Sequence, residues 1–405
     1  MKNATLLNKC LCCNSKNLSL ILDLNEQPLA NSFKQSKNEK ELTFPLKLNL
    51  CESCSHLQLS HAVNPDLLFK NYLYVSGTSD TLKEYFKWFA KFSFKFLESP
   101  PKKVLDIACN DGTQLNSWKA LGLETYGIDP AENLYKISSE NHEIICDYFT
   151  DKYTKFFREK ELDIINAQNV FAHNSYPLEF LKQCKKIMHK NTVLFIQTSQ
   201  AEMIKNNEFD TIYHEHLSFF NANSMNTLAI KAGLYLTNII KTAIHGTSYL
   251  FIFRLTNTQG NLKEVLQQEK IQGLQNIQTY ATYAKKCYET IKALTETLKT
   301  LKDRGYVVCG YGAAAKGMTL INFAKMELDF IIDDNPLKQN LFSPGMNIPI
   351  VSINHLDNIT DKKIVFIPLA WNFFKEIKAK IKIKRSKNDD IFVKYFPDVV
   401  IEGSL

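Results

Sequence analysis

The chain has 405 residues, of which 45% are hydrophobic, 22% charged and 12% aromatic, and its formal net charge is +7. This globular balance excludes disordered, collagen-like and small disulfide-stapled chains, and the length predicts two to four domains at roughly 100–200 residues each. The positive excess is spread along the chain, which favours small anionic ligands over nucleic acid. Because there is no apolar run of ~20 residues and no secretory signal before the first cysteines, we expect a cytoplasmic protein without a membrane segment.

The first expected domain covers residues 1–75 and is rich in cysteine. Two C-x2-C pairs are formed by Cys10, Cys13, Cys51 and Cys54. This spacing lets one tight turn direct two thiolates at the same ion, and two such turns complete a tetrahedral zinc site. Cys12 competes with either cysteine of the first pair as a ligand, and this alternative stays open. Four thiolates leave no position for water, so the zinc is expected to stabilise the fold rather than to catalyse a reaction.

The second expected domain covers residues 76–256 and alternates short apolar strands with helices, as in a doubly wound parallel sheet. The predicted strands are 104–108, 125–129, 144–147, 162–166 and 191–197, and a helix is predicted at 178–188. The first strand runs into a turn at 109–113 that opens a helix.

The ends of these strands suggest a nucleoside ligand. Ligands of such folds bind beyond the carboxyl ends of the strands, and an acidic residue at the end of the second strand suits a ribose diol. Asp129 stands there, and Asp147 ends the next strand. The first turn lacks the G-x-G-x-x-G pattern that cradles a pyrophosphate. A ligand with a ribose and no phosphates therefore fits better, and S-adenosylmethionine is such a ligand.

The third expected domain covers residues 257–405. It begins with a long helix whose apolar side chains recur every three or four residues from Tyr280 to Leu301, a stripe more typical of core than of a site. Strands predicted at 306–309, 328–333 and 364–368 then form a second, smaller nucleotide-binding-like unit. The glycine-rich segment 310–317 either holds a phosphate near Lys316 or allows close packing of strand and helix, and both interpretations stay open.

The segment 211–218, Thr-Ile-Tyr-His-Glu-His-Leu-Ser, is the strongest candidate for catalysis. Its His-Glu-His spacing does not place two histidines on one helix face, which disfavours zinc hydrolysis. A histidine oriented by a carboxylate can instead take a proton from a carbon beside a carbonyl. We therefore expect His216 to act as a general base that Glu215 orients or makes more basic, while Tyr213 hydrogen-bonds the oxygen that gains charge. His173, just after the fourth strand, also falls at the carboxyl edge of the sheet.

Six motifs follow one another in order along the chain. They are the paired cysteine turns, Tyr-Leu-Tyr-Val-Ser-Gly-Thr-Ser at 72–79, Asn-Asp-Gly-Thr at 110–113, Asn-Val-Phe-Ala-His at 169–173, Tyr-His-Glu-His at 213–216 and Gly-Tyr-Gly-Ala-Ala-Ala-Lys-Gly at 310–317. On these motifs the chain resembles the S-adenosylmethionine-dependent sugar C-methyltransferases of deoxysugar biosynthesis, over nearly its whole length. The resemblance implies a Rossmann-like class I methyltransferase core between a small zinc-binding domain and a second Rossmann-like domain. It also implies methylation of carbon 3 of a nucleotide-linked 4-keto-6-deoxy sugar through an enolate.

The resemblance further implies roles for single residues. The zinc ligands would be Cys10, Cys13, Cys51 and Cys54. The residues that contact S-adenosylmethionine would be Asn110, Gly112, Asp129, Asp147 and Asn169. The sugar pocket would be lined by Tyr74, His173 and Tyr213, with His216 as the general base and Glu215 as its partner. The first turn departs from the family pattern, because Ala108-Cys109 stands where glycine and serine are usual.

Two other functions remain as alternatives. An O-methyltransferase acting on a nucleotide sugar would need a base for a hydroxyl group but no ketone. A non-catalytic, zinc-stapled protein that binds nucleotide sugars would have no use for an oriented base. We expect the partner to be a nucleotide-diphosphate sugar rather than nucleic acid or a membrane, and the protein to be a monomer.

Overall fold

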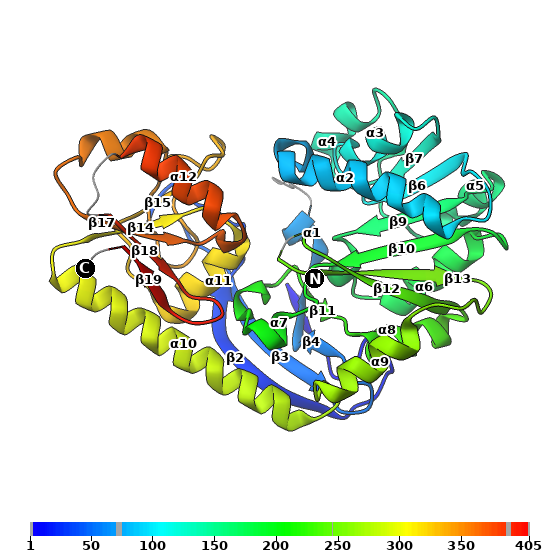
Figure 1. The fold of residues 1–405 in the computed structure, drawn as a ribbon, viewed down its shortest axis with the longest axis horizontal. Coiled ribbons are helices and arrows are strands. Elements are labelled where there is room, and N and C mark those ends of the chain that lie inside the picture. Colours follow the sequence, from blue (N-terminus) through cyan, green and yellow to red (C-terminus); the bar gives the residue numbers. More distant parts are fainter. Residues whose placement is uncertain (1–2, 70–74, 245, 386–389, 404–405) are drawn as a thin grey trace. The chain divides into compact units, whose positions relative to one another are not determined.

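A computed structural model describes residues 3–69, 75–244, 246–385 and 390–403 (Figure 1). The chain divides into two compact units, each of which joins segments that lie far apart in the sequence. The first unit consists of Met1–Ser19, Asn49–Ala201 and Leu217–Ile277, and the second of Leu20–Leu48, Glu202–His216 and Gln278–Leu405. Among the residues described, no helix has both the length and the apolar composition to cross a bilayer.

The first unit is built on a seven-stranded sheet with the strand order β12-β13-β10-β9-β6-β7-β8. Its strands are β6 (Lys103–Ile107), β7 (Glu124–Ile128), β8 (Glu143–Ile145), β9 (Ile164–Gln168), β10 (Val193–Thr198), β12 (Tyr235–Thr242) and β13 (Ser248–Arg254). Strands β6 to β10 pair in parallel, whereas β13 is antiparallel to both β10 and β12. The strands predicted in this region are confirmed as β6 to β10, and the antiparallel pair β12 and β13 was not predicted.

Helices cover both faces of this sheet (Figure 1). One face packs against α2 (Asp80–Ser93) and α3 (Thr113–Lys119), and the other against α5 (Thr154–Glu159), α6 (Pro177–Ile187) and α8 (Ala222–Ala232). Ile164 and Ile165 are neighbours on β9 but belong to the two different cores, because side chains alternate along a strand. The remaining helices are α1 (Pro65–Phe69), α4 (Glu132–Ser138) and α9 (Leu262–Ile271). The predicted doubly wound α/β architecture is confirmed.

Short strands surround the cysteine pairs of the first unit. β1 (Ala4–Leu6) pairs antiparallel with β5 (His61–Val63), and β4 (Leu57–Leu59) pairs antiparallel with β11 (Ser218–Phe219). The cysteine side chains belong to the same buried core as side chains of α6 and α8, so the cysteine turns pack onto the body of the first unit.

The second unit contains a six-stranded sheet with the order β16-β15-β14-β17-β18-β19. Its strands are β14 (Val307–Tyr311), β15 (Phe330–Ile332), β16 (Ile350–Val351), β17 (Ile364–Pro368), β18 (Ile391–Lys394) and β19 (Val400–Glu402). All neighbours are parallel except β18 and β19. Its helices include α7 (Met203–Asn206), α11 (Ala315–Ala324) and α12 (Phe374–Lys384). The three strands predicted here are confirmed as β14, β15 and β17.

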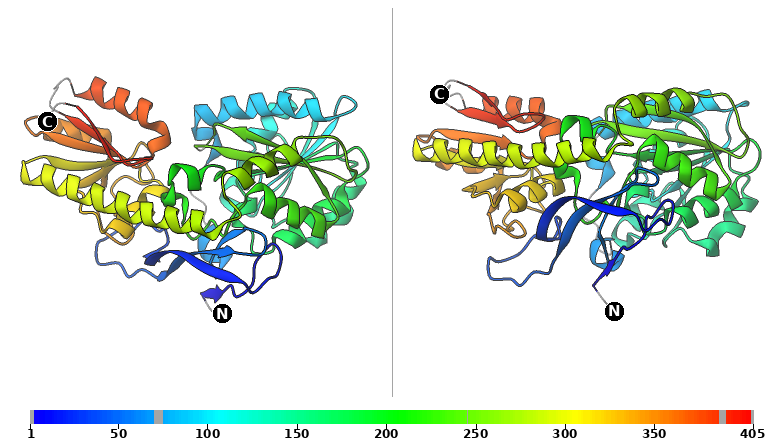
Figure 2. Two further views of the ribbon diagram at one scale, coloured as in Figure 1. Left: turned by 60° about the horizontal axis from the view of Figure 1, so that its bottom comes forward. Right: turned by 90° about the horizontal axis from the view of Figure 1, so that it is seen from below.

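The predicted apolar stripe of the third domain lies on α10 (Ile277–Asp303), which Figure 2 shows as one continuous helix. Tyr280, Cys287 and Leu294 of the stripe are buried, so it is a core face and not a site. Two long strands, β2 (Leu18–Pro28) and β3 (Thr43–Cys51), lie side by side, and most of each belongs to the second unit.

Candidate active site

The four predicted zinc ligands come together in the first unit. The Sγ atoms of Cys10, Cys13, Cys51 and Cys54 all lie within 4.8 Å of one another. The distance is 3.6 Å between the Sγ atoms of Cys10 and Cys54, and 3.5 Å between those of Cys13 and Cys51. Tetrahedral zinc with bonds of about 2.3 Å places its sulfur ligands about 3.8 Å apart. The donor set therefore fits a structural zinc ion.

Both cysteine turns have the same backbone geometry, which explains the spacing. Asn14 N donates to Cys10 O (2.9 Å), and Ser55 N donates to Cys51 O (2.8 Å). Asn14 and Ser55 both have left-handed φ values, 64° and 59°. Cys12 is buried but does not belong to the four-sulfur group, so among the described residues it does not replace Cys10 or Cys13.

The predicted cofactor turn follows β6 and is held by the acid at the end of β7. Asp129 accepts hydrogen bonds from Asn110 N at Oδ2 (2.9 Å) and from Ala131 N at Oδ1 (2.8 Å). Burial raises the pKa of this half-buried carboxyl group. Two carboxylate oxygens together accept about four hydrogen bonds. Asp129 is therefore fixed in place and still has the capacity to bind both hydroxyls of a ribose, which fits S-adenosylmethionine.

Gly112 closes this turn in a conformation that favours glycine. Its φ is +82°, and an added Cβ would lie 3.0 Å from Cδ2 of His142. His142 is itself held by Thr125 (Nδ1···Oγ1, 2.7 Å) and Asn116 (Nε2···Oδ1, 3.1 Å). The glycine thus lets the backbone turn tightly at the carboxyl edge of the sheet.

Asp147 and Asn169, the other two predicted cofactor residues, also follow strands of this sheet. Asp147 follows β8. The hydrogen bond from Tyr153 is the main cause that lowers the pKa of its carboxyl group, and the hydrogen bond from Lys152 lowers it further. Asn169 follows β9 in a left-handed conformation with φ 55°, and its N donates to Gln197 O (3.1 Å). All of the predicted cofactor residues therefore lie at the ends of the parallel strands.

His173 lies in the first unit as well, in the short 3-10 helix Phe171–His173 that follows β9. Its ring stacks on Phe69, with the centroids 5.6 Å apart and an interplanar angle of 12°. Burial lowers the pKa of His173 to about 4, which favours the neutral imidazole. Tyr74, the other residue expected to line the sugar pocket from this part of the chain, lies outside the described residues.

The Tyr213–His216 cluster belongs to the second unit, and its hydrogen bonds define one tautomer. His216 Nδ1 lies 2.8 Å from Thr211 O, and Nε2 lies 2.8 Å from the hydroxyl of Tyr213. A carbonyl oxygen only accepts, so Nδ1 carries the proton, and in the neutral ring Nε2 has the lone pair. The side chain of His216 is buried, with 5% exposed. The arrangement leaves His216 ready to accept a proton at Nε2.

Glu215 does not hydrogen-bond this ring, which corrects the expectation that it orients His216. Its Oε1 accepts from Asn31 Nδ2 (2.8 Å), and its Oε2 has no hydrogen-bond partner among the described residues. Burial raises the pKa of Glu215, and the hydrogen bond from Asn31 lowers it. The ring of His216 is oriented by Thr211 and Tyr213 because their oxygens lie beside its two nitrogens. A role of Glu215 as a charge partner stays a prediction.

Residues that the sequence did not mark hold the backbone of this cluster. Thr319 on α11 donates from Oγ1 to Ile212 O (3.1 Å). Asp210 accepts at Oδ2 from Trp371 Nε1 (2.8 Å) and from the hydroxyl of Tyr395 (3.4 Å). The C-terminal sheet and its helix therefore anchor the two residues that flank Thr211, whose carbonyl sets the tautomer of His216.

The glycine-rich segment 310–317 is explained by packing within the second unit. A Cβ on Gly310 would lie 2.8 Å from Leu369 Cδ1, and one on Gly317 would lie 2.7 Å from Leu369 Cβ. Asp333, at the end of β15, accepts from Ala313 N (2.6 Å) and fixes the loop. Of the two interpretations, close packing of strand and helix accounts for both glycines.

Comparison with known proteins places three family domains on this chain. Residues 10–69 match the "Putative zinc binding domain", residues 78–239 a methyltransferase domain, and residues 243–397 the C-methyltransferase C-terminal domain. The C-methyltransferase NovU of Streptomyces niveus is 26% identical over 386 residues, which are 92% of this chain and 91% of NovU. A ubiquinone biosynthesis O-methyltransferase of Glaesserella parasuis is 31% identical over 107 residues, covering 24% of this chain and 45% of its own length.

Solved structures of methyltransferases are similar to part of the chain. An S-adenosylmethionine-dependent methyltransferase from Archaeoglobus fulgidus is 15% identical, with a TM-score of 0.35, and the match covers 42% of this chain and 94% of that one. The plantazolicin methyltransferase BpumL in complex with SAH is also 15% identical, with a TM-score of 0.34, over 42% of this chain and 82% of that one.

The family domains occur in the order that the sequence motifs predicted, and the observed sheets and cysteine cluster agree with them. The similarity to NovU runs through all three. This chain is therefore a homologue of NovU and an S-adenosylmethionine-dependent methyltransferase, with a zinc-binding domain before its methyltransferase core and a C-methyltransferase C-terminal domain after it.

Proposed function

We propose that this enzyme transfers a methyl group to carbon 3 of a nucleotide-linked 4-keto-6-deoxy sugar. NovU is a C-methyltransferase and is similar over nearly the full length of both chains, and the C-terminal family domain is also that of C-methyltransferases. The observation that carries the proposal is the fixed tautomer of His216, because transfer to carbon requires a base for a C–H proton.

His216 removes the proton from carbon 3, which the neighbouring 4-keto group makes acidic. The proton moves to Nε2, and the electron pair of the C–H bond enters the enolate of carbons 3 and 4. Nδ1 keeps its hydrogen bond to Thr211 O while the ring becomes an imidazolium. The ring therefore need not reorient when it gains the proton.

Tyr213 donates its hydroxyl proton to the oxygen that becomes negative. The hydroxyl has a single proton and lies beside His216 Nε2 in the structure. When the ketone binds, this proton moves into a hydrogen bond with the 4-keto oxygen, which leaves Nε2 available as the base. A donor of this kind contributes about 10²- to 10³-fold to the rate of a reaction through an oxyanion.

The cofactor is held by Asn110, Gly112, Asp129, Asp147 and Asn169 in this proposal. Asp129 binds the ribose hydroxyls, and the turn around Gly112 lets the backbone approach the ligand. When bound, S-adenosylmethionine supplies an electrophilic methyl group, which carbon 3 of the enolate accepts. Glu215 favours the protonated form of His216 by its charge, and His173 and Tyr74 contact the sugar.

A substrate screen tests this function. Purified protein is incubated with methyl-labelled S-adenosylmethionine and nucleotide-linked 4-keto-6-deoxy sugars, and with the same sugars reduced to 4-hydroxy compounds. We expect the mass of one methyl group to be added to one or two ketones and to no reduced sugar. Methylation of oxygen on the reduced sugars would establish an O-methyltransferase instead. Tight binding without turnover of any sugar would support a binding protein.

A further inference from the structure

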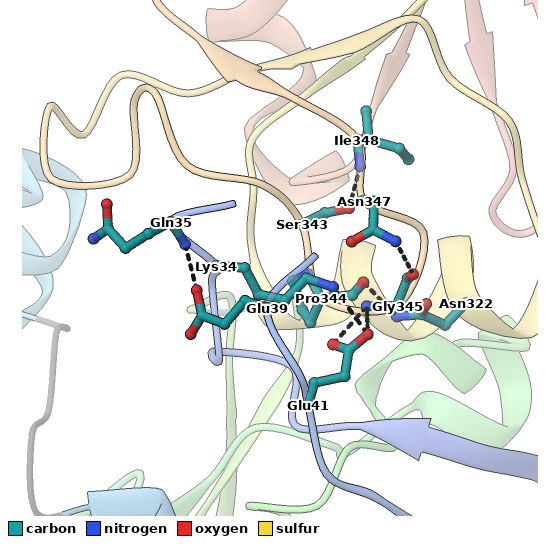
Figure 3. Close-up of polar contacts among 10 residues, drawn as sticks. All are labelled: Lys34, Gln35, Glu39, Glu41, Asn322, Ser343, Pro344, Gly345, Asn347 and Ile348. Carbon is teal, nitrogen blue, oxygen red and sulfur yellow. Dashed lines mark hydrogen bonds and ion pairs between the residues drawn. The ribbon is translucent and has the colours of Figure 1, made fainter. Parts of the chain in front are cut away.

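The loop between β2 and β3, residues 29–42, is fastened to the C-terminal segment 342–345 within the second unit (Figure 3). The backbones of Lys34 and Phe342 exchange two hydrogen bonds, with Lys34 N to Phe342 O at 2.9 Å and Phe342 N to Lys34 O at 2.8 Å. Lys34 Nζ pairs with Glu41 Oε1 (3.1 Å), and Gly345 N donates to both oxygens of Glu41 (3.1 and 2.9 Å). We call Lys34, Glu41 and Gly345 the clasp.

The ion pair of the clasp is largely buried. The side chain of Lys34 is only 4% exposed and that of Glu41 is 20% exposed. Loss of one partner leaves an uncompensated charge in the interior. Gly345 has a φ of +75°, and an added Cβ would lie 1.8 Å from Asn322 Oδ1, so a larger residue at this position would be strained and would displace the side chain of Asn322. The loop is therefore fixed in one position on the C-terminal sheet domain.

Asn31 lies in the same loop and reaches the candidate catalytic cluster. Its Nδ2 donates to Glu215 Oε1 (2.8 Å), across 184 positions of sequence. Glu215 is almost fully buried, at 3% exposed, and its Oε2 has no hydrogen-bond partner among the described residues. The amide of Asn31 is thus the side-chain group that fixes the orientation of this carboxylate.

We propose that Asn31 is a positioning residue for methyl transfer, which the clasp holds against Glu215. Asn31 acts through Glu215 and does not touch the reacting atoms. A loop from the segment that matches the zinc-binding family thereby completes the catalytic cluster. This inference rests on the proposed role of Tyr213, Glu215 and His216 in the function described above.

The chemistry of a buried carboxylate gives the reason for such a residue. Burial favours the neutral acid, and the hydrogen bond from Asn31 lowers the pKa of Glu215. Without that donor the carboxyl group loses part of its ionised population and rotates about its side-chain bonds. Both changes weaken the support that Glu215 gives to a protonated His216, so the rate of the chemical step falls while substrate binding changes little.

The test compares Asn31→Ala with a matched control, Asn38→Ala; both asparagines are exposed residues of the same loop, and Asn31 is the one that donates to Glu215. We expect Asn31→Ala to lower kcat about 10- to 100-fold, the range for loss of a hydrogen bond to a charged group. KM for the sugar and Kd for S-adenosylmethionine are expected to stay within about twofold, the usual scatter of single-site effects. Asn31→Gln, which keeps an amide donor, is expected to recover part of the rate, whereas Asn31→Asp is not.

A double-mutant cycle with Glu215→Gln shows whether Asn31 affects the rate through Glu215. The rate of methyl transfer is measured in single turnovers with excess enzyme. If Asn31 acts through Glu215, Asn31→Ala lowers the rate of the Glu215→Gln enzyme by less than about threefold, because the partner has already been altered. An equal loss in both backgrounds would overturn the proposal, and so would full activity of Asn31→Ala.

The clasp is tested by Lys34→Met against Lys40→Met, an exposed lysine of the same loop. We expect the Lys34 variant to reproduce the loss of kcat with retained binding of S-adenosylmethionine, which also verifies folding. If it folds and has the full rate, the clasp has no part in positioning. Full activity of both Glu215→Gln and His216→Asn would instead refute the proposed function itself. An inactive Glu215→Gln beside a fully active Asn31→Ala would refute only this inference.

Discussion

Asp210 offers a sharp test of how the candidate catalytic cluster, Tyr213 to His216, is held. Its side chain is fully buried directly before Thr211. Oδ2 accepts from Trp371 and Tyr395, whereas Oδ1 has no hydrogen-bond partner among the described residues. Burial raises the pKa of Asp210 to about 7, although Lys316 nearby lowers it. Asp210→Asn keeps a side-chain oxygen that can accept the hydrogen bond from Trp371, but it replaces the ionisable carboxyl group by a neutral amide.

The size and sign of the change in stability follow from the pKa of Asp210 in the unfolded and in the folded state. An aspartate of the unfolded chain has a pKa of about 3.9, so the folded value is raised by about three units, worth at most about 4 kcal/mol. Between about pH 4 and pH 7 the folded state binds more protons than the unfolded state. The contribution of Asp210 to the free energy of unfolding is therefore most favourable below this window and becomes less favourable as the pH rises through it. At pH 8 we expect Asp210→Asn to be more stable than the wild type by up to about 4 kcal/mol, and at pH 4 equally stable.

Thermal unfolding of both proteins between pH 4 and pH 8 measures this difference. For a domain of roughly 150–250 residues, 1 kcal/mol shifts Tm by about 2–4 °C. The matched control is Asp334→Asn, whose carboxylate is half exposed and pairs with Lys380 (2.7 Å). A difference in Tm that does not change with pH, or an Asp210→Asn protein that is less stable at pH 8, would show that folding does not raise the pKa of Asp210 and would contradict this prediction.

Three further predictions concern the zinc site, the cofactor turn and the glycine-rich loop. Cys51→Ser should abolish the binding of one zinc ion per chain and lower Tm, as measured by metal analysis and thermal unfolding; full zinc content would contradict the four-cysteine site. Asp129→Ala should weaken the binding of S-adenosylmethionine about 10- to 100-fold in calorimetry, because it removes the acceptor for the ribose; unchanged affinity would exclude this role. Gly317→Ala should lower stability by about 1–3 kcal/mol, since the new Cβ meets Leu369. An unaffected Tm would remove the packing explanation.

Much of the architecture could be predicted because the signals are local. Strands β6 to β10 are short apolar runs that end at turn residues, and this pattern is visible without any long-range information. The cysteine spacing likewise predicted two turns, and the structure brings their four sulfur atoms together. Whether Cys12 was a ligand could not be decided from spacing, because its exclusion depends on the direction of its side chain in the folded turn.

The hydrogen-bond partners that hold the candidate catalytic cluster could not be predicted. The partner of His216 Nδ1 is the backbone carbonyl of Thr211. Every residue has such a carbonyl, so the sequence does not show which one accepts this hydrogen bond. Asn31 donates to Glu215 and Trp371 donates to Asp210, in each case across more than a hundred residues of sequence. The sequence suggested Glu215 as the orienting group because it is adjacent in the chain, but its carboxylate bonds to Asn31 instead. The residues of the cluster could therefore be predicted because they are adjacent in the sequence, but the groups that hydrogen-bond to them could not.

In the proposed reaction, His216 removes a proton from carbon 3 of the sugar. The direct measurement is exchange of that proton with solvent deuterium, in the wild type and in His216→Asn, under conditions where both bind S-adenosylmethionine with the same affinity. We predict exchange and methyl transfer in the wild type, and neither in the variant. Exchange at the wild-type rate in His216→Asn would contradict the account and assign the base to another residue.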